Sequence, residues 1–199
     1  MIQKSPLNRL FVVSALLVLL LTNIREARAS HAMGADLSYE CIDPATNTYK
    51  VVLRFYRDCF GISQPATITL NYSSPSCGQS GSVTLNPEAC QPNTNGGSPC
   101  EVSPLCNASI LQSTCNGGTL PGVQAFTYTA TITLPQNCPD WTFRFNECCR
   151  NDLITNLVSP SSEDIYIEAT LNNTLGGCNS SPVFTTLPVP FICANQPFS

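Results

Sequence analysis

The chain has 199 residues, of which 43% are apolar and only 11% are charged, and it contains 12 cysteines, 16 prolines and 11 glycines. This composition excludes a disordered polypeptide, a coiled coil and a basic nucleic-acid-binding protein. The formal net charge is −4, so no excess of positive charge is present for phosphate backbones or anionic lipids.

The first segment has the features of a secretory signal peptide. Lys4 and Arg9 precede an uninterrupted apolar run over 10–21, which is shorter than the roughly 20 residues that cross a bilayer. A polar stretch then ends in the small-x-small pattern ARA at 27–29, which signal peptidase recognises. We predict a signal peptide over 1–29 and no membrane span after its cleavage; the alternative is an uncleaved membrane anchor.

Cleavage at this point leaves 170 residues, a length that suits one domain. It removes four of the nine basic and one of the thirteen acidic side chains, so the mature net charge is about −7. We expect neither nucleic acid nor a membrane surface as a partner.

All the cysteines follow the predicted cleavage site, and an even number in an exported chain favours disulfides. The alternative, a metal site, requires close thiolate pairs or histidine partners, and the sequence has no C-x-x-C and a single histidine, His31. Adjacent cysteines in an extended segment point to opposite faces, so Cys148 and Cys149 are predicted to have two different partners. The predicted disulfide cysteines are Cys41, Cys59, Cys77, Cys90, Cys100, Cys106, Cys115, Cys138, Cys148, Cys149, Cys178 and Cys193.

Short strands follow one another along the chain, with almost no helical periodicity. The predicted strands cover 35–41, 48–56, 66–72, 82–85, 125–134, the alternating residues from Trp141 to Phe145, and 165–171. Proline, glycine and asparagine turns separate them. Seven such strands predict an all-β fold, a disulfide-rich antiparallel β-sandwich of immunoglobulin-like type.

Two of these strands show which face is buried. Over 48–56, the apolar face consists of Tyr49, Val51, Leu53 and Phe55. Over 125–134, aromatic and aliphatic residues alternate with a row of threonines, which belong on the solvent side.

Between 73 and 122 the composition changes. These fifty residues contain five cysteines, six prolines and seven glycines but only two charged residues, Glu88 and Glu101. We predict a long Cys/Pro/Gly-rich loop inserted in a domain over 30–179, stapled by its cysteines and either a binding surface or a merely tolerated insertion. The remaining residues, 180–199, are predicted to form a Pro-rich linker.

Four blocks of the sequence resemble a known protein family. They are SHAMGADLSYEC at 30–41, YKVVLRFYRDCFG at 49–61, FNECCRNDLITN at 145–156 and NSSPVFTTLPVPFICANQPFS at 179–199. In this order they resemble the N-terminal module of gliding-motility-associated surface proteins of gliding bacteria, which are similar to multidomain adhesins. YRDC at 56–59 and CCRN at 148–151 carry the resemblance most specifically.

The resemblance implies a β-rich module, secreted or at the cell surface, without known catalysis. In the family, further repeats and a C-terminal sorting domain follow this module, whereas this sequence stops just after the linker motif CANQPF. Residues 180–199 would therefore lead to a missing downstream repeat, and a periplasmic location is the alternative.

Catalysis is disfavoured by the residues themselves. No histidine lies inside the predicted domain, and oxidised cysteines cannot act as nucleophiles. A carboxylate pair for glycoside hydrolysis is formally available, but no spacing singles out two residues. We expect no catalytic residue, cofactor or metal.

The two motifs predict a shared network of charges. A period of two carries Arg57 to the buried face of its strand and Glu147 to the buried face of another. Asp58 and Arg150 adjoin the same cysteines, so we predict an Arg-carboxylate network at one end of the sandwich. Alternatively, all four charges are solvated at strand ends.

Three functions remain open. The first is a structural or adhesive module that binds a protein or glycan ligand at a surface. The second is a stand-alone secreted ligand-binding or inhibitor-like domain, and the third is a glycan hydrolase, which the scattered acidic residues disfavour.

Overall fold

The computed structural model describes residues 32–90, 96–151 and 154–183. It consists of seven strands with three short 3₁₀ helices and no α-helix among these residues. The strands are β1 (Ala32–Asp43), β2 (Thr48–Asp58), β3 (Ile68–Ser74), β4 (Gln79–Pro87), β5 (Val123–Thr133), β6 (Trp141–Cys148) and β7 (Asp164–Leu171). Each predicted strand is present, displaced at its ends by a few residues.

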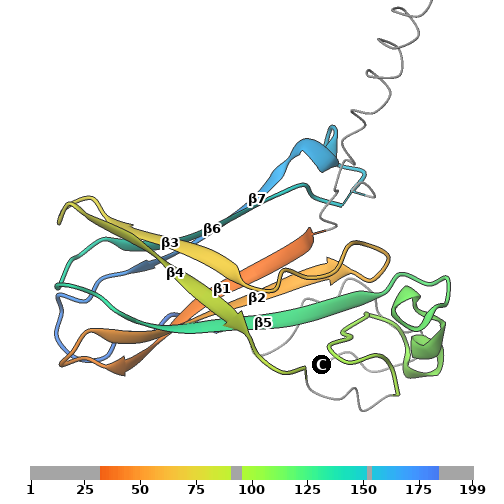
Figure 1. Cartoon of the computed structure of the whole chain (residues 1–199), viewed down its shortest axis with the longest axis horizontal. Coiled ribbons are helices and arrows are strands. Elements are labelled where there is room, and N and C mark those ends of the chain that lie inside the picture. The colour runs from red at the N-terminus through yellow and green to blue at the C-terminus, as the bar shows by residue number, and fades with distance from the viewer. Residues whose placement is uncertain (1–31, 91–95, 152–153, 184–199) are drawn as a thin grey trace, which may run out of the picture.

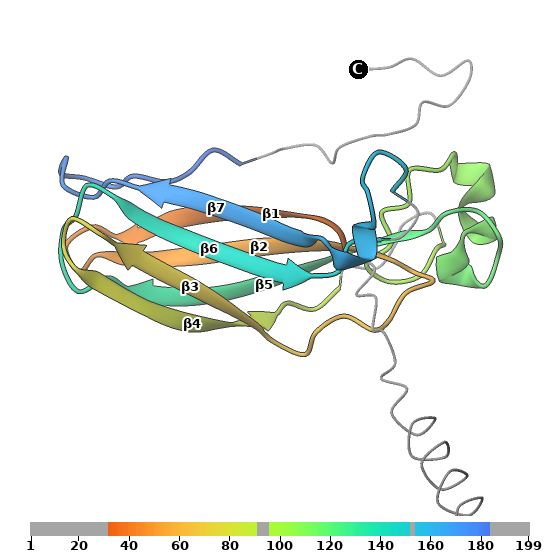
Figure 2. The same ribbon diagram turned by 90° about the horizontal axis from the view of Figure 1, so that it is seen from above.

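The strands form two antiparallel layers (Figures 1 and 2). One layer contains β1, β2 and β5, and the other contains β4, β3, β6 and β7. The end of β4 also pairs with β5, which joins the layers into the order β1-β2-β5-β4-β3-β6-β7. Strands β1, β2 and β5 lie opposite β3, β6 and β7. This is the connectivity of an immunoglobulin-like sandwich.

Alternation along the strands explains why they pack in this way. In β2, Tyr49, Val51, Leu53 and Phe55 are buried, which confirms the predicted core face. In β5, the threonine row lies on the outer side, opposite the buried aromatic and aliphatic residues. Aromatic rings span the layers: the ring centroids of β2 Phe55 and β6 Phe145 are 6.2 Å apart, edge to face.

The predicted insertion begins too early. Ser73 and Ser74 belong to β3, and β4 follows after the turn at 75–78, so the irregular segment covers 88–122. The strand predicted at 82–85 lies inside β4, which is longer at both ends, and Leu85 is fully buried. Within this hairpin Gly81 lies opposite Tyr72, and a Cβ at Gly81 would come within 2.5 Å of the Tyr72 hydroxyl oxygen, so a glycine leaves room for the ring.

Residues that follow the predicted domain boundary at 179 contact β1. Ser181 donates its amide hydrogen to the carbonyl oxygen of Tyr39 in β1 (3.0 Å), and the Ser180 hydroxyl accepts one from the Cys41 amide (3.0 Å). The chain after β7 therefore returns along the edge of β1. Both the predicted signal peptide at 1–29 and most of the predicted linker lie outside the described residues. Within the described ranges, no helix is long and apolar enough to cross a membrane.

Disulfides connect distant parts of this fold. The described pairs are Cys41–Cys178, Cys59–Cys115, Cys77–Cys138, Cys90–Cys100 and Cys148–Cys149. Cys106 is also disulfide-bonded, and Cys193 lies outside the described residues.

The prediction of separate partners for Cys148 and Cys149 is wrong. These neighbours form a disulfide with each other, and their Cα atoms are 3.7 Å apart. Cys149 has a φ of 82°, which is not extended backbone. The alternation of an extended strand therefore ends at Cys148, and both sulfurs can reach the same side.

Candidate recognition surface at the loop end

Three connections leave the sandwich at the same end, where β1 also begins. They are the β2–β3 loop (59–67), the segment 88–122 between β4 and β5, and the β6–β7 loop (149–163). In Figure 1 the β2–β3 loop and the described part of the segment 88–122 lie beyond the ends of β2 and β5, and the β6–β7 loop lies apart from them beyond the end of β6. We call this region the loop end. Loops clustered at one end of an immunoglobulin-like sandwich are a frequent position for binding surfaces.

Arg57 shapes the start of the β2–β3 loop from inside. Its side chain is buried and donates hydrogen bonds to the carbonyl oxygens of Asp58 (3.2 Å), Cys59 (3.2 Å) and Gly61 (3.1 Å). Burial lowers the pKa of Arg57 from its usual value, and the charge of Asp58 partly opposes this effect. The buried cation thus folds the loop by satisfying carbonyls that strand pairing has left free.

Asp58 links this loop to the CCRN motif. One carboxylate oxygen accepts a hydrogen bond from the amide of Phe60 (2.9 Å), and the other accepts one from the side-chain amide of Asn151 (2.9 Å). The backbone amide of Asn151 donates to the carbonyl oxygen of Ala32 in β1 (3.3 Å). The YRDC and CCRN motifs therefore lie together at the loop end.

The two remaining charges of the predicted network are placed differently. Glu147 is half-buried near the end of β6, and burial, followed by the charge of Asp164, raises its pKa. Arg150 is half-buried, and its Nε has no hydrogen-bond partner. Within the described residues the ion pairs are Lys50–Glu88 and Arg144–Glu168, so Arg57, Asp58, Glu147 and Arg150 form no Arg-carboxylate ion pairs.

The irregular segment is attached to the sandwich by backbone and by sulfur. The amide of Val102 donates to the carbonyl oxygen of Val123 (2.8 Å), and that of Ala125 donates to Cys100 (2.9 Å), so this stretch runs along the start of β5. Cys59–Cys115 joins the β2–β3 loop to the 3₁₀ helix η2 (Thr114–Asn116). These links fix the position of the segment relative to β5 and the β2–β3 loop.

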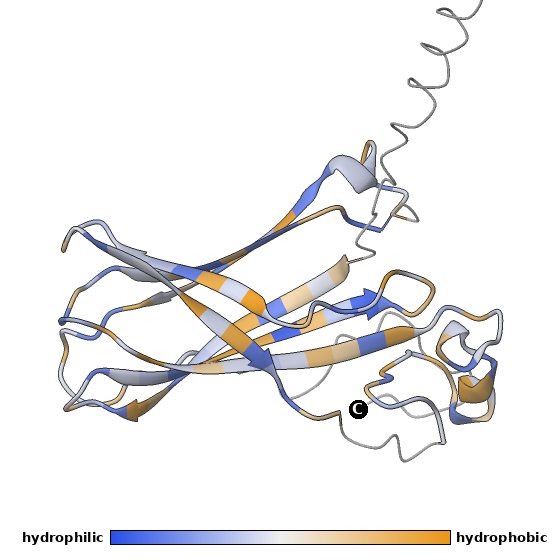
Figure 3. Cartoon of the chain, viewed as in Figure 1, coloured by the Kyte–Doolittle hydropathy of each residue, from blue (hydrophilic) through white to orange (hydrophobic). Residues whose placement is uncertain are grey.

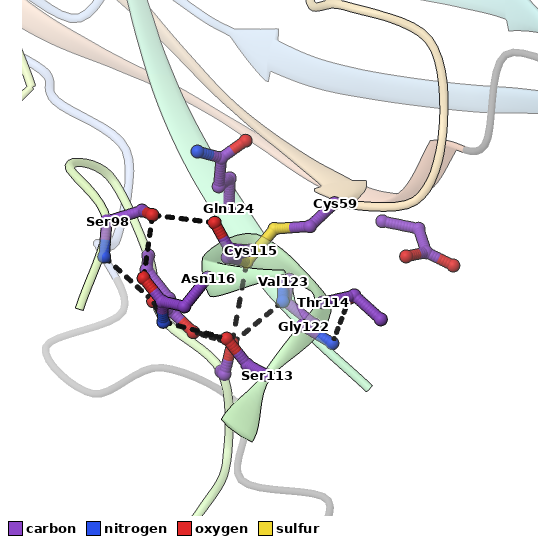
Figure 4. The surroundings of a disulfide bond; sticks show 12 residues. Cys59, Ser98, Ser113, Thr114, Cys115, Asn116, Gly122, Val123 and Gln124 are labelled. Carbon is purple, nitrogen blue, oxygen red and sulfur yellow. Dashed lines mark hydrogen bonds between the residues drawn. A yellow bond between two sulfur atoms is a disulfide. The ribbon is translucent and has the colours of Figure 1, made fainter. Parts of the chain in front are cut away.

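A buried carboxylate organises the same segment. Glu101 accepts hydrogen bonds from the hydroxyls of Ser103 (2.6 Å) and Ser113 (2.5 Å), the side-chain amide of Asn116 (2.8 Å) and the amide of Ser98 (3.0 Å). Figure 4 shows Ser98, Ser113 and Asn116 gathered beside the Cys59–Cys115 bond. Burial alone would raise the pKa of Glu101, but these hydrogen bonds outweigh it and lower the pKa.

Sequence reasoning missed this role of Glu101. The sequence did contain one indication, because Glu101 is one of only two charged residues in 73–122. Such a carboxylate must either face solvent or accept hydrogen bonds from nearby donors. Serine and asparagine residues supply those donors, but their sequence separation from Glu101 hides the arrangement.

Apolar side chains are exposed at the loop end. Five of the nine exposed large apolar residues described in the chain lie here, which distinguishes this end from the rest of the surface: Met33, Phe60, Ile62, Leu111 and Val158. Phe60, at 82% exposure, extends from the loop that Arg57 and Asp58 shape. Figure 3 shows hydrophobic stretches in the β2–β3 loop and beside the 3₁₀ helices.

Comparisons with other proteins and a search for metal-binding groups add no further site. Among the described residues, no group of three or more His, Cys, Asp or Glu residues could hold a metal ion. Family models, curated proteins and solved structures contain no match for this chain.

Proposed function

We propose that this protein is a non-catalytic recognition module, secreted or at the cell surface, with a structural or adhesive role. It binds its ligand through the loop end. The exposed aromatic and aliphatic side chains favour a protein ligand over a glycan, because low charge and aromatic anchors characterise the centres of protein interfaces.

The observation that carries this proposal is the presentation of Phe60. Its ring is almost entirely exposed, yet its backbone amide is held by Asp58 and the adjacent Cys59 is cross-linked to Cys115. A large apolar side chain on a constrained loop loses little conformational entropy on binding, which increases affinity. Exposure of this kind costs solubility and is typical of interaction sites.

Two further features support an extracellular role. Numerous disulfides are typical of proteins in oxidising compartments. The sequence blocks that resemble the N-terminal module of gliding-motility-associated proteins support the proposal that the chain is the N-terminal part of an adhesin-like surface protein.

The test compares two substitutions at residues of equal exposure. The labelled secreted chain is applied to an array of extracellular proteins and glycans, together with Phe60→Asp and Leu175→Asp. Leu175 is also 82% exposed but follows β7 at the opposite end of the sandwich. Loss of an interface anchor costs about 2 kcal/mol, so we expect Phe60→Asp to weaken binding about thirtyfold while Leu175→Asp binds normally.

Equal loss in both variants would contradict the proposal, as would full binding by Phe60→Asp. The melting temperature of each variant serves as the control for folding. If the unaltered chain binds glycans but no protein on the array, the ligand of the loop end is a carbohydrate instead.

A further inference from the structure

The Cys148–Cys149 disulfide differs from the other described pairs in what it connects. The others join residues 10 to 137 positions apart, whereas this one joins neighbours. A disulfide stabilises a fold mainly by restricting the unfolded chain, and the restriction grows with the length of the closed loop. A bond between neighbours closes the smallest loop possible, so the fold as a whole gains little from it.

Its effect is instead on the local backbone. Cys148 is the last residue of β6 and pairs with Asp164 in β7. At Cys149 the φ of 82° ends the extended conformation, a backbone region that L-residues other than Asn and Asp rarely adopt. The amides of Cys149 and Arg150 then both donate to the carbonyl oxygen of Glu163 (3.2 and 3.1 Å), in place of regular strand pairing.

The next residues connect this turn to the loop end. Asn151 bonds to Ala32 in β1 through its backbone and to Asp58 through its side chain. The conformation of Cys149 therefore determines the direction in which the β6–β7 loop begins and the position from which Asn151 reaches the β2–β3 loop.

The same site is accessible from solvent. Cys148 is exposed, as is Cys178 of the Cys41–Cys178 pair, whereas Cys138 of the Cys77–Cys138 pair is completely buried. Reduction removes the cross-link that accompanies the positive φ of Cys149, a backbone region that cysteine rarely adopts. At Cys41–Cys178, by contrast, the hydrogen bonds of Ser180 and Ser181 to β1 continue to hold the two thiols next to each other, which favours their reoxidation.

We propose that Cys148–Cys149 is a thiol-exchange site whose redox state controls the conformation of the CCRN segment. A thiolate of an external dithiol attacks the Cys148 sulfur, and Cys149 leaves as a thiolate and takes up a proton. The second thiol of the dithiol then displaces Cys148 from the mixed disulfide. The protein disulfide gains two electrons and two protons, and the dithiol is oxidised to its own disulfide.

Differential alkylation tests the exchange directly. The folded chain is treated with increasing dithiothreitol, alkylated with iodoacetamide, then denatured, fully reduced and labelled with a second reagent. Trypsin releases both cysteines in the peptide 145–150, which contains no other cysteine. We expect this peptide to be half-labelled by the first reagent at a dithiothreitol concentration at least tenfold lower than any other cysteine peptide. Labelling together with the others, or after them, would overturn the proposal.

Limited trypsin digestion tests the conformational effect. Lys50, Arg54 and Arg57 lie in β2 and Arg144 lies in β6, whereas Arg150 follows the end of β6, so cleavage after Arg150 reports on the CCRN segment. We expect the double variant Cys148→Ser/Cys149→Ser to be cleaved there at least fivefold faster than the oxidised chain. The matched variant Cys41→Ser/Cys178→Ser, which removes a disulfide at the opposite end, should leave this rate unchanged.

Equal cleavage of the Cys148→Ser/Cys149→Ser variant and the oxidised chain would refute control of the segment by the disulfide. A melting temperature measured for each variant separates local loosening from global unfolding. Neither test uses the ligand of the loop end, so the outcome is independent of the proposed function.

Discussion

Two charged side chains are buried among the described residues, Arg57 and Glu101, and each is satisfied by groups close to it in space. Arg57 uses the backbone carbonyls of three of the next four residues, and Glu101 uses hydroxyl and amide donors of its own segment. Burial of these charges is possible because several well-placed hydrogen bonds replace their hydration.

Replacing Arg57 tests this arrangement. Arg57→Ala removes one hydrogen bond from each of three carbonyl groups, of which Asp58 keeps the bond from the Gly61 amide, and we expect a loss of about 2 kcal/mol in the free energy of unfolding, measured with urea. An unpaired buried carboxylate, as in the predicted ionic network, would cost about 3 kcal/mol or more. Arg54→Ala, on the other face of β2, is the control. A loss below about 0.5 kcal/mol would show that Arg57 belongs to the solvated surface.

The ionisation of Glu147 makes the stability of the fold depend on pH. Its pKa is raised by burial and by Asp164 above the ordinary value of 4.5, so the folded chain holds this proton more tightly than the unfolded chain. The resulting destabilisation is absent below pH 4.5, appears as the pH rises toward the folded-state pKa and is complete above it.

Glu147→Gln removes this ionisation. We expect a higher melting temperature than the unaltered chain at pH 7 and no difference at about pH 4. Calorimetry at both pH values measures the effect, and Glu40→Gln, at an exposed position of β1, is the control. A stabilisation that persists unchanged at the lower pH would exclude ionisation of Glu147 as its cause.

At the scale of elements, the β3–β4 hairpin and the irregular segment 88–122 are held by different forces. The hairpin has a continuous ladder of backbone hydrogen bonds and buries Ile68, Leu70 and Leu85. The segment has little regular structure and depends on cross-links such as Cys59–Cys115 and Cys90–Cys100.

Full reduction should therefore separate the two elements. We expect amide hydrogen exchange to accelerate first over 88–122, because removal of the cross-links restores its conformational entropy, while 68–87 stays protected. Mass spectrometry of the exchanged, reduced chain measures both regions in one experiment. Simultaneous loss of protection over both regions would show that the hairpin also depends on the disulfides.

At the scale of the whole molecule, the chain after β7 completes the sandwich. Ser181 bonds to both the amide and the carbonyl of Tyr39, through its hydroxyl and its backbone amide, and Cys178 is linked to Cys41. This strap, residues 172–183, covers part of the β1 edge. An uncovered sheet edge presents free backbone groups to other chains.

Ending the chain after Leu171 should expose that edge. In a Cys41→Ser/Cys106→Ser background, which avoids unpaired thiols, we expect a lower melting temperature and concentration-dependent association in size-exclusion chromatography with light scattering. The full chain with Cys41→Ser/Cys178→Ser and Cys106→Ser/Cys193→Ser retains the backbone pairing and should remain monodisperse. If the shortened chain elutes identically to that control, the strap does not protect the edge.

The alternation of apolar residues determined most of the fold by itself. Side chains two residues apart on a strand share a face, so the burial of Tyr49, Val51, Leu53 and Phe55 follows from the sequence wherever the strand is placed. The proximity of the YRDC and CCRN motifs was also predictable, because the strands that precede them, β2 and β6, run in the same direction and end at the same end of the sandwich.

Only the tertiary structure decided how charges, cysteines and boundaries are used. Arg57 was expected to contact carboxylates, but carbonyl groups of its own loop lie nearer, and a period of two cannot specify which acceptor a buried donor meets. The Cys148–Cys149 bond depends on one positive φ, a local departure from the extended conformation that alternation assumes. The strap is weakly apolar and gains its order from hydrogen bonds and a disulfide to β1, a strand distant in sequence, which residue patterns do not encode.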